Sequence, residues 1–353
     1  MGHFSSLLFY IFSFFLSYYF YKMYNKHHCK IFLFLSFAIP MFIGGLRYMV
    51  GTDYKAYMDL YDIYHKYSFL NFIKSASIEM GFVLICQISS YFWGYKTLFF
   101  IFNFLTLLFT FLTIKKTDTQ YKSIAYLAYL FLYYTSSFNG IRQMLAVSII
   151  FYAYHFIEKK DFKNWLLFAI LASIFHTSAL LLIPIYFIFN NDNNIIKYFS
   201  IVFVTLISIY YRNILTYIAG IEFFAKYAKY EIYTASYQFN NYSFFLYLLV
   251  LLYISFFYKK LVIYSKNNRM LYLIFVFGVI LSFTGFVNPD IKRITAYFKI
   301  VEIFLLSQIP FLCVNNKNKL LNYFIIMVYF ISSFILNSYV FGQSDIIPYN
   351  FIW

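Results

Sequence analysis

Charge is scarce in this sequence. Only 12% of the 353 residues are Asp, Glu, Lys or Arg, whereas 63% are hydrophobic. Such a chain has too little polar surface for a water-soluble globule, so the bilayer is expected to be its solvent. The hydrophobic residues fall into separate runs near the ~20 residues that a helix needs to cross a bilayer. The sequence therefore predicts an all-α, polytopic integral membrane protein.

Signatures of common cofactor sites are missing as well. The three cysteines, Cys29, Cys86 and Cys313, have neither metal-ligand spacing nor an obvious pairing, so the sequence supports no zinc site and no disulfide scaffold. The motifs HExxH, Walker A, GxSxG and GxGxxG do not occur. No internal repeat is evident, which leaves an inverted-repeat transporter without support. The net charge of +15 is spread between hydrophobic runs, so it indicates membrane orientation and not nucleic-acid binding.

Lysine-rich turns between the hydrophobic runs set the expected topology. The positive-inside rule places these turns in the cytoplasm, which puts both termini outside and predicts about 12 crossings in one polytopic domain, residues 1–353. Two long polar segments, 47–79 and 213–241, then become extracytoplasmic loops. Residues 80–94 are expected to be re-entrant or interfacial, because the lysines that follow require a single crossing, at 97–114.

Residues 163–212 allow two arrangements, since they start inside, end outside and therefore contain one crossing or three. Three crossings, with breaks after residues 176 and 189, fit the length and place His176 at an outer hairpin. A single tilted helix over 163–189 would instead bury His176 at mid-depth. The sequence leaves both arrangements open.

Arginine is rare beside lysine, with five arginines among the 28 basic residues. Arg47, Arg142 and Arg293 fall at outer ends of spans, each beside Gly, Asn or Asp. A guanidinium binds phosphate or carboxylate in a bidentate way, which suggests an anionic ligand. Arg142 follows Asn139 at a helix N-terminus, where free N–H groups already favour an anion. The alternative is snorkelling to lipid headgroups, an interpretation that suits Arg212 best.

Several outer residues are candidates for acid or base chemistry. His176 is a candidate general acid or base, or a donor to a sugar or phosphate oxygen; as a lone histidine it is also a candidate structural hydrogen-bonding residue. Asp53, Glu79 and Asp290 are the outer carboxylates best placed to act as a base. Asp53 and Asp290 are equally suited to orient the arginines next to them.

Five stretches together resemble one known family, and they occur in that family's order over nearly the whole chain. They are GLRYMVGTDYKAY from Gly45, IEMGF from Ile78, NGIRQMLAVSIIF from Asn139, LASIFHTSALLLIP from Leu171 and RITAYF from Arg293. The most distinctive is an Arg-Gln pair followed about 33 residues later by a histidine between apolar runs. The chain resembles the EpsG family, the Wzy-like polymerases of O-antigen, capsular and exopolysaccharide repeat units.

The resemblance implies a multi-pass enzyme of the bacterial inner membrane that joins undecaprenyl-diphosphate-linked oligosaccharides at the outer face, without a metal or nucleotide cofactor. In such a mechanism a carboxylate or His176 deprotonates the acceptor hydroxyl, and arginines stabilise the departing diphosphate. The expected partners are the lipid-linked substrate, membrane lipids and polysaccharide assembly proteins such as a chain-length regulator. The expected catalytic residues are His176, Asp53, Glu79 and Asp290, and the expected binding residues are Arg47, Tyr54, Asn139, Arg142, Gln143 and Arg293.

Two other function classes remain. A flippase or transporter of lipid-linked sugars would place charged residues along a path open to both faces, whereas here they gather on one. A sugar ligase or a membrane acyltransferase would share the outer-face arrangement.

Overall fold

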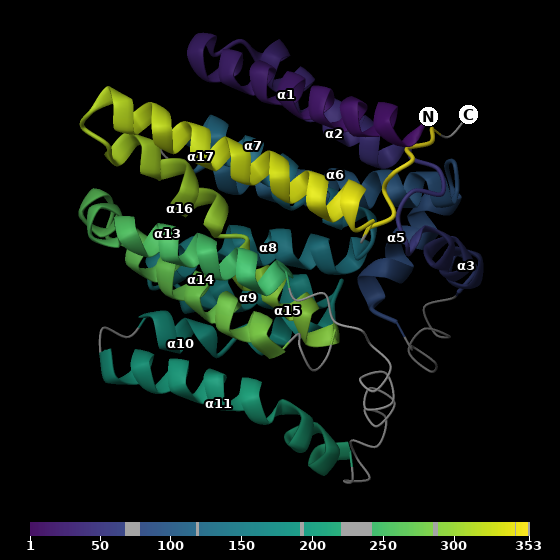
Figure 1. Ribbon diagram of the computed structural model, residues 1–353. Helices are drawn as coiled ribbons and strands as arrows, with labels where there is room; N and C mark the ends of the chain where they lie inside the picture. The colour runs from purple at the N-terminus through teal and green to yellow at the C-terminus, as the bar shows by residue number, and fades with distance from the viewer. Residues whose placement is uncertain are drawn as a thin grey trace. The chain divides into compact units, whose positions relative to one another are not determined.

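A computed structural model describes residues 1–67, 78–117, 120–190, 194–219, 242–284, 289–342 and 344–351 of the chain (Figure 1). Within these ranges the protein is helical, and its only β-type pairing is an isolated bridge between Arg47 and Phe351. The all-α prediction holds for this part of the chain. The predicted loop at 213–241 lies outside it, except that helix α11 (Asn194–Ala219) continues through the loop's first residues.

The helices fall into two compact units. The first consists of Met1–Phe156, Lys163–Ile183 and Cys313–Trp353. Its helices are α1 (His3–His27), α2 (Lys30–Gly45), α3 (Tyr54–Tyr64), α5 (Met80–Ser90), α6 (Tyr95–Lys115), α7 (Lys122–Leu132), η1 (Tyr134–Phe138), most of α8 (Ile141–Glu158), α9 (Phe162–Ser173), η2 (Thr177–Leu182), α17 (Asn316–Ile335) and the short π-helix η5 (Leu336–Val340).

The second unit consists of Ile157–Phe162 and Pro184–Leu312. Inside it the Asn268 and Gln308 side chains exchange hydrogen bonds of 2.7 and 3.1 Å, so two buried amides satisfy each other. The prediction of a single domain stays a prediction. Besides α11, the helices of the second unit are α10 (Ile185–Asn190), α13 (Tyr242–Tyr264), α14 (Asn267–Thr284), α15 (Pro289–Lys299), α16 (Glu302–Gln308) and η4 (Ile309–Leu312).

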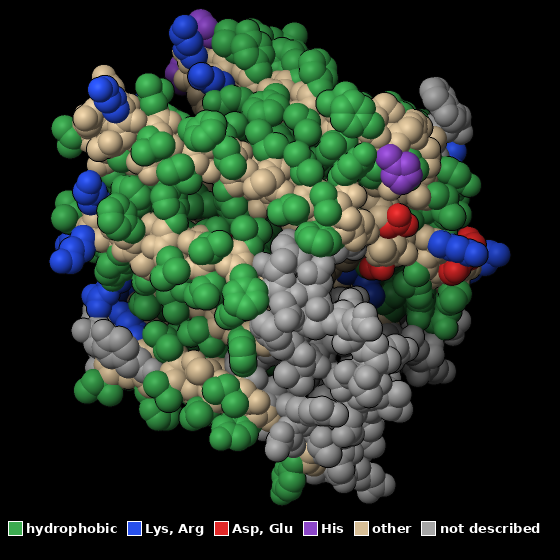
Figure 2. All heavy atoms as spheres, viewed as in Figure 1, with side chains coloured by type: hydrophobic (Ala, Val, Ile, Leu, Met, Phe, Trp, Pro, Cys, Tyr) green, Lys and Arg blue, Asp and Glu red, His purple; other side chains and the backbone are tan. Residues whose placement is uncertain are grey.

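By length and composition, five helices of the described chain are able to cross a membrane: His3–His27, Tyr95–Lys115, Phe244–Tyr264, Ile294–Leu312 and Asn316–Val340. Other apolar helices are shorter. Hydrophobic side chains cover much of the surface visible in Figure 2, as a lipid-facing surface requires. These features belong to a multi-pass membrane protein, and the total of 12 crossings stays a prediction.

A short helix folds back along a long one in the first unit. Helix α5 has 11 residues and is followed, after a turn containing Gly94 at φ 62°, by the 21-residue helix α6. The rings of Phe82 and Phe102 lie 5.9 Å apart, so the two helices run antiparallel. At 1.5 Å per residue α5 is about 16 Å long, roughly half of α6 and too short to cross a bilayer. Helix α6 matches the crossing predicted at 97–114.

The chain reverses direction at His176. Helix α9 ends at Ser173, and the backbone of His176 is extended, with φ −155° and ψ 112°. The indole N–H of Trp165 donates to the Ile183 carbonyl at 3.3 Å, so the segments on either side of His176 lie against each other. The alternative of one tilted helix over 163–189 is therefore wrong, and His176 occupies the tip of a hairpin.

Candidate functional site

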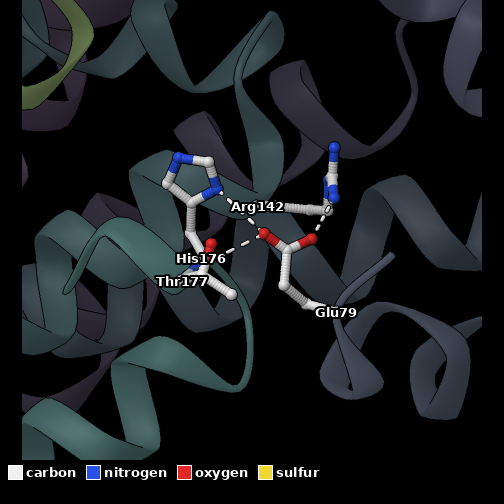
Figure 3. A network of polar contacts seen from close by, with 4 residues as sticks. All are labelled: Glu79, Arg142, His176 and Thr177. Atoms are coloured by element: carbon white, nitrogen blue, oxygen red, sulfur yellow. Dashed lines mark hydrogen bonds and ion pairs between the residues drawn. The ribbon is translucent and has the colours of Figure 1, made fainter. Parts of the chain in front are cut away.

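Three segments far apart in the sequence bring Glu79, Arg142 and His176 together (Figure 3). Glu79 is the residue before α5 and has extended backbone. Arg142 lies in the first turn of α8, and His176 lies at the tip of the α9–η2 hairpin. All three belong to the first compact unit. The structure thus groups three of the residues that the sequence analysis singled out separately.

Glu79 is the centre of this cluster. Arg142 Nη1 donates to Glu79 Oε2 in an ion pair. His176 Nδ1 lies 3.2 Å from Glu79 Oε1, and the backbone N–H of Thr177 donates to the same oxygen at 3.3 Å. Figure 3 shows the carboxylate between the Arg142 and His176 side chains, with one oxygen facing each. The carboxylate therefore accepts hydrogen bonds through both of its oxygens.

The surroundings of Glu79 favour its ionised form. Burial raises the pKa of the carboxyl group, but the hydrogen bond from His176 and the positive charge of Arg142 outweigh burial and lower the pKa to about 2. Only 11% of the Glu79 side chain is exposed. A carboxylate this acidic is a weak base. Its geometry suits orientation of its neighbours better than proton abstraction.

His176 has the geometry of a general base. An ionised carboxylate only accepts hydrogen bonds, so the bond to Glu79 requires the proton on Nδ1. In the neutral imidazole the lone pair is then on Nε2, on the side of the ring away from Glu79, and 27% of the side chain is exposed. A carboxylate that fixes the tautomer of a histidine in this way is a recurring arrangement in catalytic sites.

A glycine permits the close approach of the hairpin to α5. The N–H of Gly81 donates to the Ile174 carbonyl at 2.8 Å. A Cβ on Gly81 would lie 2.6 Å from the Phe175 ring and 2.8 Å from the Ile174 oxygen, so any larger residue would push His176 away from Glu79. Sequence reasoning missed this role, although the glycine stands two residues after Glu79 in IEMGF.

Two aromatic rings also lie against the guanidinium of Arg142. Its guanidinium carbon lies 5.6 Å from the centre of the Phe82 ring and 5.9 Å from that of Tyr57. Its Nε is buried and forms no hydrogen bond with the described residues. Arg142 therefore combines a fixed position with donor capacity beyond its pairing to Glu79.

Arg47 forms a separate buried cluster. Only 1% of the residue is exposed, and its guanidinium donates to the carbonyls of Gly44, Val50 (3.3 Å) and Phe138 (3.1 Å). The Phe99 and Phe138 rings lie 4.7 and 4.5 Å from the guanidinium carbon. Arg47 thus ties the end of α2 to the segment that leads into α8. Its predicted contact with the substrate stays a prediction, and its geometry is that of a brace.

Two further predicted binding residues belong with this brace. Tyr54 is 1% exposed and its ring stacks on Phe99 with centres 4.3 Å apart. Asn139 donates to the Ser344 carbonyl at 3.0 Å, which attaches the start of α8 to the C-terminal segment.

The remaining predicted residues are Gln143, Asp53, Asp290 and Arg293. Gln143 is buried on α8, next to Arg142. Asp53 is half-buried and accepts a 3.2 Å hydrogen bond from the Thr52 hydroxyl. Asp290 and Arg293 lie in α15 of the second unit, and their side chains are outside the described residues. No group of three or more His, Cys, Asp or Glu able to hold a metal ion occurs in the described part of the chain.

Comparison with known proteins adds one match. The model of the EpsG family matches residues 30–351, which include every residue of the cluster. No curated protein and no solved structure gave a significant match.

Proposed function

The chain belongs to the EpsG family, and we propose that this polysaccharide-associated membrane protein is a polymerase of undecaprenyl-diphosphate-linked oligosaccharide repeat units. The proposed location is the bacterial inner membrane, with the reaction at its outer face. The observation that carries the proposal is the cluster in which Glu79 holds a cation, Arg142, and a potential base, His176, side by side.

His176 is the proposed general base. Its Nε2 accepts the proton of the acceptor sugar hydroxyl while that oxygen forms a bond to the anomeric carbon of the donor sugar. The bond from this carbon to the diphosphate breaks, and the lipid diphosphate leaves with the electron pair. Glu79 fixes the tautomer of His176 and stabilises the imidazolium that forms, since its ionised carboxylate lies 3.2 Å from Nδ1.

Arg142 is the proposed partner of the leaving diphosphate. Negative charge grows on the bridging phosphate oxygen as the glycosidic bond breaks, and a fixed guanidinium stabilises that charge more in the transition state than in the bound substrate. The partial exposure of Arg142 supports this role, because 23% of its side chain stays accessible while Nη1 pairs with Glu79. Arg47 is proposed as the brace that positions the start of α8, and the predicted binding role of Arg293 stays a prediction.

A strain that lacks this protein tests the proposal. We expect single lipid-linked repeat units to accumulate at the outer face of the inner membrane, and the wild-type chain supplied in trans to restore long polymer. Repeat units trapped at the inner face would contradict polymerisation and identify a flippase. Long polymer that is made but not transferred to its final acceptor would identify a ligase.

A further inference from the structure

A cavity at the turn between α5 and α6 has no role in the cluster around Glu79. Its volume is about 570 Å³, and its walls include Leu46, Phe92, Trp93, Thr97 and Phe100. Phe92 and Trp93 are 71% and 76% exposed, and the Thr97 hydroxyl already accepts a 3.0 Å hydrogen bond from the Trp93 N–H. The lining is mainly apolar, so the cavity suits a hydrocarbon chain better than a sugar, whose hydroxyls would go unpaired.

One cation stands at this apolar cavity. Lys96, half-buried in the first turn of α6, lines it. No carboxylate of the described residues forms an ion pair with Lys96. A half-buried lysine without an acidic partner, beside apolar walls, is complementary to an amphipathic ligand with an anionic head. An isoprenoid diphosphate has this chemistry.

The distance from the cavity to the cluster distinguishes between the two lipid-linked substrates. The ring of Phe175, the residue before His176, lies 6.2 Å from the Phe102 ring. Phe102 is six residues beyond Lys96, so Lys96 and the cluster are separated by about 9 Å along α6, at 1.5 Å per residue. The donor's reacting carbon is bonded to its own diphosphate, so that diphosphate has to lie next to the base. The acceptor's reacting hydroxyl is separated from its diphosphate by an oligosaccharide. Only the acceptor fits an anion site this far from His176.

We propose that this cavity binds the lipid diphosphate of the acceptor, with the phosphates at Lys96, the first isoprene units between Trp93 and Phe100, and the oligosaccharide reaching back to His176. This inference rests on the proposed polymerase function. In this arrangement Arg142 binds the diphosphate of the donor and Lys96 that of the acceptor, and both cations belong to the first unit.

The test uses the purified full-length chain in vesicles of a zwitterionic lipid, with a sugar-free polyprenyl diphosphate that carries a photoreactive group in its isoprenoid tail. We expect labelling of residues 91–100 in the wild type. Replacement of a cation that contacts phosphate lowers affinity roughly tenfold, so Lys96→Glu should reduce the labelling by about that factor. Lys55→Glu, which changes an exposed lysine on α3, should leave the labelling unchanged.

An aromatic pair supplies a second control. Trp93→Ala removes a wall of the cavity, whereas Tyr91→Ala removes an 85% exposed ring that is not among the lining residues. We expect only the former to reduce labelling. Equal labelling of Lys96→Glu and wild type would overturn the proposal, as would equal competition by phosphatidylglycerol, which would identify a general anionic-lipid site.

A kinetic readout separates this inference from the function on which it rests. In polymerisation with a fixed, saturating donor, Lys96→Glu should raise the KM for the acceptor roughly tenfold and leave kcat within about twofold. A reduced kcat with unchanged KM would overturn the acceptor role. His176→Ala should abolish turnover and keep the labelling at 91–100. Failure of the wild-type chain to polymerise, with labelling intact, would refute the proposed function without refuting the lipid diphosphate site.

Discussion

Replacing Glu79 by glutamine tests the role of the carboxylate at the centre of the cluster. The carboxylate accepts from Arg142 on one side and from His176 and Thr177 on the other. A glutamine side chain has a single acceptor atom, so it is able to serve only one side and presents an N–H₂ donor to the other. The substitution also removes the negative charge that stabilises the imidazolium formed when His176 takes a proton.

The geometry gives the size of the expected effect. A full charge about 4 Å away is worth about 4 kcal/mol at an effective dielectric constant of 20. Since 11% of the Glu79 side chain and 27% of the His176 side chain are exposed, solvent reduces this figure. About 2 to 3 kcal/mol remains, which is the upper range for a hydrogen bond to a charged group. Glu79→Gln should therefore lower kcat roughly 30- to 150-fold.

The assay is the initial rate of chain extension by the purified protein in vesicles, with saturating lipid-linked repeat units. Asp59→Asn is the matched control, because it removes one carboxylate from an exposed position on α3. It should polymerise like the wild type. A kcat for Glu79→Gln within twofold of the wild-type value, in protein that is fully folded, would refute the reasoning.

Three further predictions follow from the same contacts. Arg142→Ala should reduce polymerisation by roughly two orders of magnitude. Arg142→Lys should reduce it by less, since lysine keeps the charge but lacks the planar guanidinium that binds an anion through two N–H groups. A normal distribution of polymer lengths from both variants would exclude the diphosphate contact. Arg47→Lys should destabilise the protein by roughly 2–4 kcal/mol, because buried carbonyls lose their donors; an unchanged melting temperature would exclude the brace. The pKa of Glu79 is lowered to about 2, so its contribution to stability should be complete above about pH 4.3, the ordinary value for Glu, and fall as the pH drops toward 2. Melting temperatures of the wild type should decline across this window more steeply than those of Glu79→Gln, and parallel curves would contradict the assignment.

Much of the fold could be predicted from the pattern of apolar runs and lysines. Apolar runs of helical length predicted the long helices, and the lysines after residue 114 located α6. The break at His176 was one of two alternatives, because an apolar stretch of this length fits both a straight helix and a hairpin. The contact between Trp165 and Ile183 that decides between them is tertiary.

The candidate site was only partly predictable. Residue chemistry identified Arg142, Glu79 and His176 as candidates, but not that they meet, since 63 and 97 residues separate Glu79 from its two partners. From its charge alone, Arg47 was also predicted to bind the substrate. Its burial depends on the Phe99 and Phe138 rings and on distant carbonyls, which no local pattern reveals.

The most direct test of the central claim compares two histidine variants in a strain that lacks the wild-type protein. His176 contacts Glu79 in the cluster, whereas His155 lies in the last turn of α8, at the opposite end of that helix from Arg142. We expect His176→Ala to yield only single lipid-linked repeat units at the outer face, and His155→Ala to yield long polymer at wild-type levels. Long polymer from a well-expressed His176→Ala protein would contradict the assignment of this cluster as the site of polymerisation.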